Sequence, residues 1–263
     1  MHKAKAKFSG RMQMQEIEIF ENEGTIKWNG QTIDPSAYTF DVPITGTIYG
    51  TLLNYQGVLE QLGEALHHDP YKTPPKAPIL YLKPKNTMIG HQAFIPMPED
   101  ESALEVGACL GLVIGEKASR VSEEDAMSYI EGYTIVNDIS VPHESLFRPA
   151  VKQKARDGFC PVGPWIVNRR DTILNPDNLS VRVYVNGECK QENHTRNLVR
   201  AVPKLLEDVT EFMTLDKGDI LLVGIPENPP LVKDGDLVRV EIEQVGALEN
   251  RVRKEGLIGG IQS

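Results

Sequence analysis

The chain has 263 residues, a formal net charge of −9 at pH 7 and an isoelectric point near 5.3. This excess of negative charge repels polyanions, so nucleic acids and anionic membranes are excluded as main partners. No run of residues approaches the ~20 apolar residues of a membrane-spanning helix. Three cysteines without paired spacing indicate reduced thiols. We therefore expect a soluble cytoplasmic protein whose basic clusters bind small anions.

The N-terminal part of the chain predicts a small β unit. Residues 15–20 alternate between polar and apolar side chains, and residues 25–28 lead into Asn29-Gly30. An Asn-Gly step between two strand-like runs favours a two-residue hairpin, because both turn positions need a positive φ. We expect residues 1–45 to form this unit and residues 46–263 to form the main domain.

Three segments carry helical signals. Apolar residues recur at helical spacing over residues 51–68, and Pro70 ends that pattern. Residues 122–131 begin with a sequence typical of a capping box, which predicts a second helix. Residues 195–213 have one apolar face, and Pro203 predicts that the regular helix begins near that position.

Strand signals dominate the rest of the chain. Residues 106–114 form a continuous apolar run typical of a strand buried on both faces. Residues 181–187 end in a second Asn-Gly hairpin signal, and residues 219–224 and 237–245 are strand-like, followed by a glycine-rich tail. Because strands outnumber helices and do not alternate regularly with them, we expect an α+β fold with a mixed or rolled sheet.

Asp138 is a candidate site residue because it follows directly on the apolar run of residues 133–136. A strand end holds a side chain rigidly, so this carboxylate could be a metal ligand or a general base. A turn-forming or helix-capping aspartate is an equally open interpretation. No histidine pair has metal-ligand spacing, and only His143 lies close to Asp138 in the sequence.

Three basic residues alternate just beyond this point, at Lys152, Lys154 and Arg156. If the segment is extended, their side chains share one face and could clamp a dicarboxylate. The alternative is a solvated basic loop that is paired with Asp157. The apolar flanks of Cys160 favour a buried, unreactive thiol over a thiolate nucleophile.

One glycine turn could also approach a ligand. In Gly224-Ile225-Pro226, the glycine ahead of the proline lets backbone N–H groups come close to a bound molecule, although an ordinary turn is the open alternative. The sequence contains no phosphate loop, dinucleotide fingerprint or G-x-S-x-G elbow. Nucleotide binding and serine hydrolysis of that type are therefore not indicated.

Short motifs occur in a consistent order along nearly the whole chain. They are Tyr81-Leu82-Lys83-Pro84, Leu112-Val113-Ile114-Gly115, Gly132-Tyr133-Thr134, Asn137-Asp138, Lys154 with Asp157-Gly158-Phe159, residues 161–165, Val185-Asn186-Gly187, Gly218-Asp219 and residues 246–250. Together they resemble the fumarylacetoacetate hydrolase family. Within it, segments such as YKTPPKAP, KPKNTMIG and NDISVPHESLFRPAVKQKARDGF are most similar to the isomerase/decarboxylase branch of 4-hydroxyphenylacetate degradation, specifically to its N-terminal half or subunit.

This resemblance implies a mixed β-roll with a few short helices over residues 46–263. It implies decarboxylation of 5-oxopent-3-ene-1,2,5-tricarboxylate, isomerisation of 2-hydroxyhepta-2,4-diene-1,7-dioate, or both, in 4-hydroxyphenylacetate (homoprotocatechuate) catabolism. A divalent ion such as Mg²⁺ would stabilise the dienolate. The residues implied are Lys154 and Asp138 in catalysis, Asp138 at the metal, and Arg148, Gln191 and Gly224 at the substrate. The implied assembly is a homodimer, or a hetero-oligomer with a sister subunit.

The sequence departs from the family pattern at the metal position. The two glutamates expected ahead of Val-Ile-Gly fall at Gly107 and Cys109, so that only Asp138 remains. Glu105 would lie on the same strand face but about 7 Å farther along, beyond the reach of a metal bond of ~2.1 Å. With a single carboxylate, a metal would arrive with the substrate or be absent from this chain.

The expected acid/base residues are also missing. Val58 and Gln61 stand where the family pattern has a histidine and a glutamate, and Ile225 stands in place of a threonine. Two main hypotheses follow. The chain is an enzyme in its own right, or it is a catalytically degenerate subunit that scaffolds a metal-bearing sister subunit. A small-anion binding module is the third interpretation.

Overall fold

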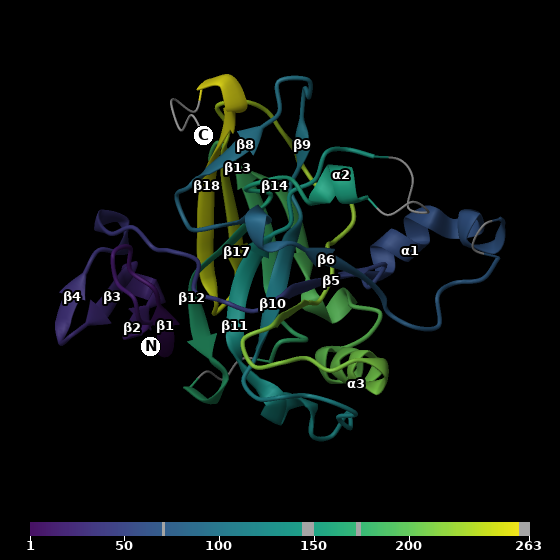
Figure 1. Cartoon of the computed structure of the whole chain (residues 1–263), viewed down its shortest axis with the longest axis horizontal. Helices are drawn as coiled ribbons and strands as arrows, with labels where there is room; N and C mark the ends of the chain where they lie inside the picture. Colours follow the sequence, from purple (N-terminus) through teal and green to yellow (C-terminus); the bar gives the residue numbers. More distant parts are fainter. Residues whose placement is uncertain (70–71, 144–149, 172–174, 258–263) are drawn as a thin grey trace.

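The computed structural model describes residues 1–69, 72–143, 150–171 and 175–257. The main sheet has 11 strands in the order β4-β3-β2-β1-β12-β11-β10-β15-β5-β6, with β7 beside β12. A second sheet has the order β14-β13-β17-β18-β8 and packs on the first, because β18 contacts both β11 and β12 (Figure 1). This is the α+β arrangement with mixed sheets that the sequence predicts.

The strands of the main sheet are short at its edges and longest at its centre. In spatial order they are β4 (Gln31–Ile33), β3 (Thr25–Trp28), β2 (Gln15–Phe20), β1 (His2–Ala6), β12 (Cys160–Asn168), β11 (Ile130–Asn137), β10 (Ala108–Ile114), β15 (Ile220–Leu222), β5 (Ile48–Leu52) and β6 (Ile79–Lys83), with β7 at Met88–Ile89.

The remaining elements of the described chain include the second sheet, a small strand ladder and three α-helices. The second sheet contains β14 (Glu188–His194), β13 (Ser180–Val185), β17 (Leu237–Ile242), β18 (Gly246–Lys254) and β8 (Phe94–Met97), and a small ladder joins β16 (Leu231–Val232) to β9 (Leu104–Glu105). The α-helices of the described chain are α1 (Gln56–Leu62), α2 (Val151–Lys154) and α3 (Val202–Phe212). No described helix is long and apolar enough to cross a membrane.

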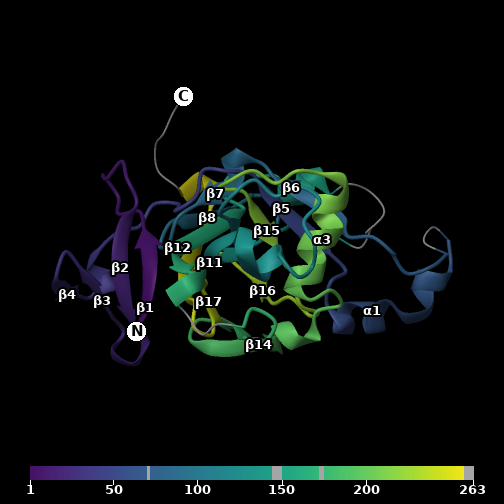
Figure 2. The ribbon, with the colours of Figure 1, turned by 90° about the horizontal axis from the view of Figure 1, so that it is seen from below.

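Both predicted Asn-Gly hairpins are confirmed. Asn29 and Gly30 have φ of 48° and 80° between β3 and β4, and Asn186 and Gly187 have φ of 52° and 84° between β13 and β14. The N-terminal hairpins do not stand apart from the rest, because β1 pairs antiparallel with β12 and extends the main sheet outward (Figure 2). A boundary near residue 45 stays a prediction.

The helix predictions have mixed outcomes. Helix α3 spans 202–212 and carries Pro203 in its first turn, as predicted. The helix predicted over 51–68 is shorter, because residues 48–52 form β5 and a 3-10 turn replaces the helix over Gly63–His67. The prediction of a helix over residues 122–131 is wrong. Its side-chain cap forms, but only the 3-10 turn Ala126–Tyr129 follows, because Ile130 already pairs with β10 in the core.

One strand was missed. The glycine-rich tail contains β18, which pairs with β17 along its length and buries alternate side chains at Leu248, Asn250 and Val252. This strand begins at Gly246. The structure shows the reason for this glycine, which has a φ of 125° and lies directly against the Trp165 indole.

The centre of the main sheet holds the site residues in place. Every residue of β10 is buried, and β11 is buried on both faces apart from partly covered Glu131. The two strands pair from Ala108 with Asn137 to Ile114 with Ile130. Asp138 therefore leaves the end of a strand that is fixed by neighbours on both sides.

A glycine in this central sheet gives a test of the packing. A methyl group on Gly132 of β11 would overlap the carbonyl oxygen of Val167 in β12, and a backbone atom cannot rotate away. We expect Gly132→Ala to lower the free energy of unfolding by about 1–3 kcal/mol. In the control Gly111→Ala, the nearest atoms are side-chain methyl groups at 3.1 Å that can shift. Urea unfolding of both variants would contradict this account if Gly132→Ala were no more destabilising than the control.

Candidate active site

The candidate site is centred on Asp138, which lies at the end of β11 with no exposed side-chain surface. Its Oδ2 accepts a hydrogen bond of 2.9 Å from Lys154 Nζ, and its Oδ1 lies 2.7 Å from Lys83 Nζ. The Lys83 contact is an ion pair without good hydrogen-bond alignment, because Lys83 Nζ donates to the carbonyl oxygens of Ile139 and Lys154. One carboxylate thus meets two ammonium groups inside the protein.

Electrostatics keep this carboxylate ionised. Burial alone would raise the pKa of Asp138, but the charges of Lys154 and Lys83 outweigh burial and hold the pKa well below its usual range. At neutral pH Asp138 is therefore a fixed counter-ion and a poor proton donor. With two positive charges against one negative charge, the cluster keeps an excess of positive charge for an anionic ligand.

Tyr81 completes the cluster from the edge strand β6. Its hydroxyl donates to Asp138 Oδ2, and Lys154 Nζ lies 5.0 Å from the centre of its ring. Burial and the negative charge of Asp138 raise the pKa of Tyr81 well above its usual value, so the hydroxyl stays a donor. Gly50, opposite Tyr81 in the β5–β6 ladder, leaves room for the ring, because a Cβ there would overlap it.

A cavity of about 230 Å³ opens beside the cluster. This is smaller than the roughly 300–1,000 Å³ typical of drug-sized ligand sites and suits a small metabolite. Lys154 Nζ is the cation of the cluster that reaches it, since its side chain is 11% exposed whereas Lys83 is fully covered. The lining residues are Thr51, Leu52, Leu53, Val58, Gln61, Glu105, Gly107, Asp138, Ser140, His143, Lys154, and 225–229. The contributing elements β9, α2 and α1 lie on the side away from the N-terminal strands (Figure 1).

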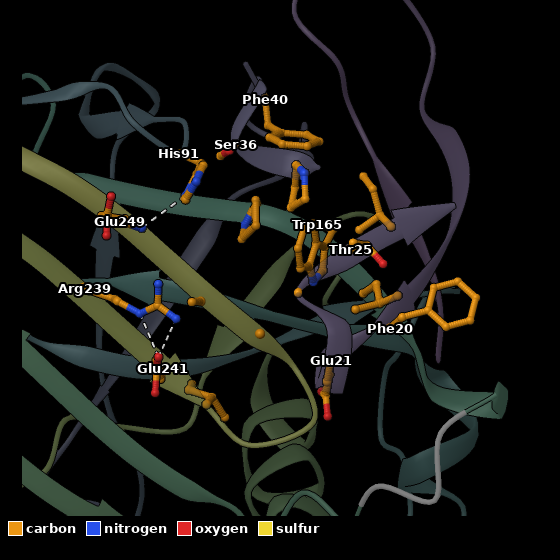
Figure 3. A pocket seen from close by; sticks show the side chains of 18 of the residues that line it. Phe20, Glu21, Thr25, Ser36, Phe40, His91, Trp165, Arg239, Glu241 and Glu249 are labelled. Carbon is orange, nitrogen blue, oxygen red and sulfur yellow. Dashed lines mark hydrogen bonds and ion pairs between the residues drawn. The ribbon is translucent and has the colours of Figure 1, made fainter. Parts of the chain in front are cut away.

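A second, larger cavity does not have comparable chemistry. It measures about 530 Å³ and lies between the N-terminal strands and the second sheet, next to Phe40 and Trp165 (Figure 3). Its two arginines already have partners, since Arg239 pairs with Glu241 and Arg182 pairs with Glu192. Burial lowers the pKa of His91 to about 4, and its Nδ1 already accepts a hydrogen bond from the backbone of Glu249. The smaller cavity at Asp138 is therefore the better candidate.

The basic clamp predicted from residues 152–156 is wrong. The segment forms the short helix α2 rather than an extended strand, so the three cations do not share a face. Lys154 turns inward to Asp138, Lys152 is exposed, and Arg156 pairs at 3.6 Å with Glu101. No ion pair of Asp157 is found among the described residues either, and its carboxylate accepts a hydrogen bond from Asn86.

Neither of the two described residues that were predicted to bind substrate lines the cavity. The backbone oxygen of Gly224 accepts from the Cys109 thiol, and its neighbour Ile225 is the one that lines the cavity. Gln191 donates at 2.6 Å to the backbone oxygen of Glu227 and so supports the cavity wall from outside. Arg148 lies outside the described residues. A contact of these residues with substrate stays a prediction.

The residues present do not fit a divalent ion. A Cβ on Gly107 would lie 2.5 Å from the backbone oxygen of Asp138, and Ile225 also fills this space. Burial raises the pKa of the Cys109 thiol, which stays protonated and donates to a carbonyl. Both Asp138 oxygens are engaged by lysines. Across the described ranges, no three His, Cys, Asp or Glu side chains are grouped to hold a metal.

The positions where the family pattern has acid/base residues also lie at this cavity. Val58 and Gln61 both line it, so their lack of acid/base chemistry affects the site directly. Gln61 is held instead by a 2.9 Å hydrogen bond to Asn228. Burial raises the pKa of Cys160 to about 12, in agreement with the unreactive thiol predicted there.

The sequence interpretation missed Tyr81 and Lys83 as site residues. They stand two apart in the strand Ile79–Lys83, and such spacing puts both side chains on one face. A lysine within an apolar strand that ends at a proline could have given the signal, because a buried ammonium group needs a partner. Their common partner, Asp138, could not be identified from local sequence.

Comparison with known proteins agrees with this fold. The family model described as fumarylacetoacetate (FAA) hydrolase C-terminal matches residues 47–253. The 4-hydroxyphenylacetate degradation bifunctional isomerase/decarboxylase of Escherichia coli is 42% identical over 210 residues, which make up 80% of this chain and 48% of that protein. The chain thus spans about half the length of the curated relatives it matches.

Solved structures are similar over almost the whole chain. The 5-carboxymethyl-2-hydroxymuconate delta-isomerase of Mycobacterium smegmatis has a TM-score of 0.78 at 28% identity and covers 97% of this chain and 100% of its own. The 2-hydroxyhepta-2,4-diene-1,7-dioate isomerase of Mycobacterium marinum has a TM-score of 0.78 at 27% identity, with coverage of 97% and 99%.

Removing the central carboxylate should destabilise the protein in a pH-dependent way. Asp138→Asn leaves two buried ammonium groups without a counter-charge, which should cost about 3–5 kcal/mol at neutral pH. Because the folded-state pKa of Asp138 is depressed, its contribution is complete above about pH 4 and is lost at lower pH, where the unfolded chain takes up the proton first. In urea unfolding, the difference in free energy of unfolding between wild type and Asp138→Asn should therefore become smaller below about pH 4.

The matched control is Glu131→Gln, which removes the partner of Lys5, a side chain that is 41% exposed. A partly exposed pair of this kind contributes no more than about 1 kcal/mol. If Asp138→Asn were no more destabilising at pH 7 than Glu131→Gln, the proposed electrostatic role of the cluster would be refuted.

The misfit at the metal position has its own test. We expect the metal-free chain to leave the electron paramagnetic resonance signal of added Mn²⁺ unchanged, because no carboxylate at the cluster is free to bind it. Loss of that signal in wild type, together with its return in Asp138→Asn, would contradict this expectation.

Proposed function

The chain belongs to the fumarylacetoacetate hydrolase family, and from that premise we propose that it acts on a small, unsaturated oxo-dicarboxylate or oxo-tricarboxylate. The reactions are decarboxylation of 5-oxopent-3-ene-1,2,5-tricarboxylate, isomerisation of 2-hydroxyhepta-2,4-diene-1,7-dioate, or both. The similarity to the E. coli isomerase/decarboxylase and to the M. marinum isomerase supports this substrate class.

The observation that carries the proposal is the Lys154 ammonium group at the cavity wall. It is held by Asp138 and lies over the Tyr81 ring, so its position is fixed before the substrate enters. A preorganised cation in a small, largely covered cavity stabilises developing negative charge far better than the same cation in water. Such a cation serves both reactions, because both pass through a dienolate.

In the decarboxylation, the bond between the substrate carbon and the departing carboxylate breaks, and CO2 leaves. The electron pair of that bond moves through the conjugated double bond onto the oxo group, which becomes an enolate oxygen. Lys154 Nζ stabilises this oxygen by charge and by a hydrogen bond. The buried Thr51 hydroxyl lines the same cavity without a partner among the described residues, so it is available to donate to a substrate carboxylate.

In the isomerisation, the same delocalised dienolate forms when the enol hydroxyl loses its proton. A proton then adds to carbon at the far end of the diene, and the enolate oxygen becomes a carbonyl again. Asp138 and Lys83 act on this chemistry indirectly, because they hold Lys154 and carry the counter-charge. They are positioning residues in this scheme.

A second candidate function also has a specific observation behind it. The chain lacks carboxylates at Gly107 and Cys109, the two positions where the family pattern has metal-ligand glutamates. This lack favours a subunit that pairs with a metal-bearing sister chain and scaffolds its site. The two candidates differ in whether the isolated chain turns over substrate.

The test uses a matched pair of lysines from one short helix. Lys154→Met removes the cation at the cavity but keeps the length of the side chain, and we expect kcat/KM for diene consumption to fall by about 10²–10³. Lys152→Met, two residues earlier on the exposed surface, should leave the rate unchanged. Absorbance of the conjugated diene gives the rate, and circular dichroism verifies that both variants are folded.

The alternative makes a different set of predictions. If the chain is a scaffold, purified wild type is inactive, and activity appears only with a sister subunit and survives Lys154→Met. Turnover by the isolated chain that depends on Lys154 would exclude the scaffold function.

A further inference from the structure

Proton transfer to carbon needs a donor at this cavity, and the expected one is missing. General acid/base catalysis is supplied by a side chain that can carry a proton at the reacting atom. Val58 and Gln61 stand at the expected positions and cannot do so. Apart from Asp138, Lys154 and the neighbouring Tyr81 and Lys83, the described titratable side chains at the cavity are Glu105, His143 and Glu227.

We propose that Glu105 is the residue that delivers the proton to the dienolate carbon and, in the reverse direction, removes it. This inference rests on the function proposed above. It assigns the second catalytic role, with Lys154 at the oxygen end of the substrate and Glu105 at the carbon end.

The structure holds Glu105 in place from two sides. It belongs to β9, where it pairs with Leu231 of β16, and on its other side it forms an isolated bridge with Ser140. The backbone bonds of that bridge measure 2.8 and 3.2 Å. The Ser140 hydroxyl donates to Glu105 Oε2 at 3.1 Å. A carboxyl group on paired strands keeps the precise orientation that proton transfer requires.

The charge environment of Glu105 differs from that of Asp138. Asp138 is tied to two lysines, whereas no ion pair engages Glu105 within the part of the chain that the structure describes. Its side chain is half-buried at the cavity wall, and the donor that it has among the described residues is the neutral Ser140 hydroxyl. Among the described residues, Glu105 thus has no counter-ion, whereas Asp138 has two.

The strand register sets the backbone of Glu105 apart from that of Asp138. The backbone N–H of Asp138 donates to Gly107, and two residues farther on Ser140 is bridged to Glu105. Two residues of extended chain measure about 7 Å. Glu105 therefore lies beyond the Asp138–Lys154 pair along the same strand edge. A proton donor for the far end of the diene needs such a position, because the enolate oxygen at the other end is bound by Lys154.

The two other titratable groups are less well placed. Glu227 is directed at α1, since its carboxyl group occupies the space that a side chain on Gly57 would fill, and Asn193 donates to its Oε1. His143 Nδ1 donates to the backbone oxygen of Val141, two residues away, and His143 lies beyond the last bridged residue of the segment. These two residues serve as controls.

The step balances without a further reagent. The carboxylic acid form of Glu105 gives its proton to the terminal carbon, the dienolate electron pair forms the new C–H bond, and the enolate oxygen becomes a carbonyl. The enol proton lost earlier has passed to water, and the Glu105 carboxylate recovers a proton from water. No group is oxidised or reduced.

The experiment compares Glu105→Gln with His143→Gln and Glu227→Gln in the full chain. Glutamine keeps the shape of Glu105 and can still accept from Ser140, but it cannot donate an acidic proton. We measure diene loss for isomerisation, CO2 release for decarboxylation, and deuterium uptake at the substrate carbon in D2O. Thermal unfolding of each variant verifies the fold.

We expect Glu105→Gln to lower kcat for isomerisation and the rate of deuterium uptake by about 10²–10⁴ with little change in KM. Decarboxylation should fall by less than about tenfold, because C–C cleavage needs the cation and not the proton donor. In His143→Gln and Glu227→Gln, which also line the cavity, any fall in isomerisation should be matched by an equal fall in decarboxylation, because neither residue delivers the proton.

The outcomes separate this inference from the function on which it rests. An inactive wild type overturns the proposed function and the Glu105 assignment with it. An active wild type overturns the assignment alone if Glu105→Gln still isomerises and exchanges deuterium, if His143→Gln or Glu227→Gln is the variant that loses exchange, or if the wild type decarboxylates without isomerising.

Discussion

The ionised Asp138 carboxylate between two buried ammonium groups is the interaction on which the site depends. Taking three charges out of water is costly, and their mutual attraction offsets that cost only when the geometry is good. Lys83 shares its remaining protons with two carbonyl oxygens, and Tyr81 adds a donor to the carboxylate. The cluster thereby holds the Lys154 side chain in place at the cavity. Any anion that binds there meets a cation whose position is already fixed.

The fold supplies this geometry through elements that are far apart in the sequence. Asp138 leaves the central strand β11, Tyr81 and Lys83 come from the edge strand β6, and Lys154 comes from α2. The site residues that lie on strands are held in place by the pairing of the main sheet. There is no room for a metal-ligand side chain at Gly107, because Ile225 and the Asp138 carbonyl occupy the space beside it. The cavity therefore favours a lysine-based site over a metal-based one.

Local sequence was a good guide where local physics decides the structure. The Asn29-Gly30 turn and the start of α3 at Pro203 follow from backbone preferences that depend on a few neighbouring residues. The segment after Ser122 was misjudged because pairing of Ile130 with β10 overrides a well-formed cap. The motif around Asp138 and Lys154 contains two residues that the structure brings into contact at one cavity, but the clamp predicted over residues 152–156 is wrong, since a helical turn separates the three cations. Lys83 and Glu105 lie near Asp138 because of contacts between segments that are far apart in the sequence, and a local sequence pattern cannot predict such contacts.

The most direct test of the central claim is a crystal structure of this chain grown with Mn²⁺ and an unreactive 2-oxo-dicarboxylate, measured at the manganese absorption edge. The lysine-based account predicts ligand oxygen within hydrogen-bond distance of Lys154 Nζ, an Asp138 carboxylate still paired with both lysines, and no anomalous peak beside it. An anomalous peak coordinated by Asp138, with the lysines displaced, would contradict the account.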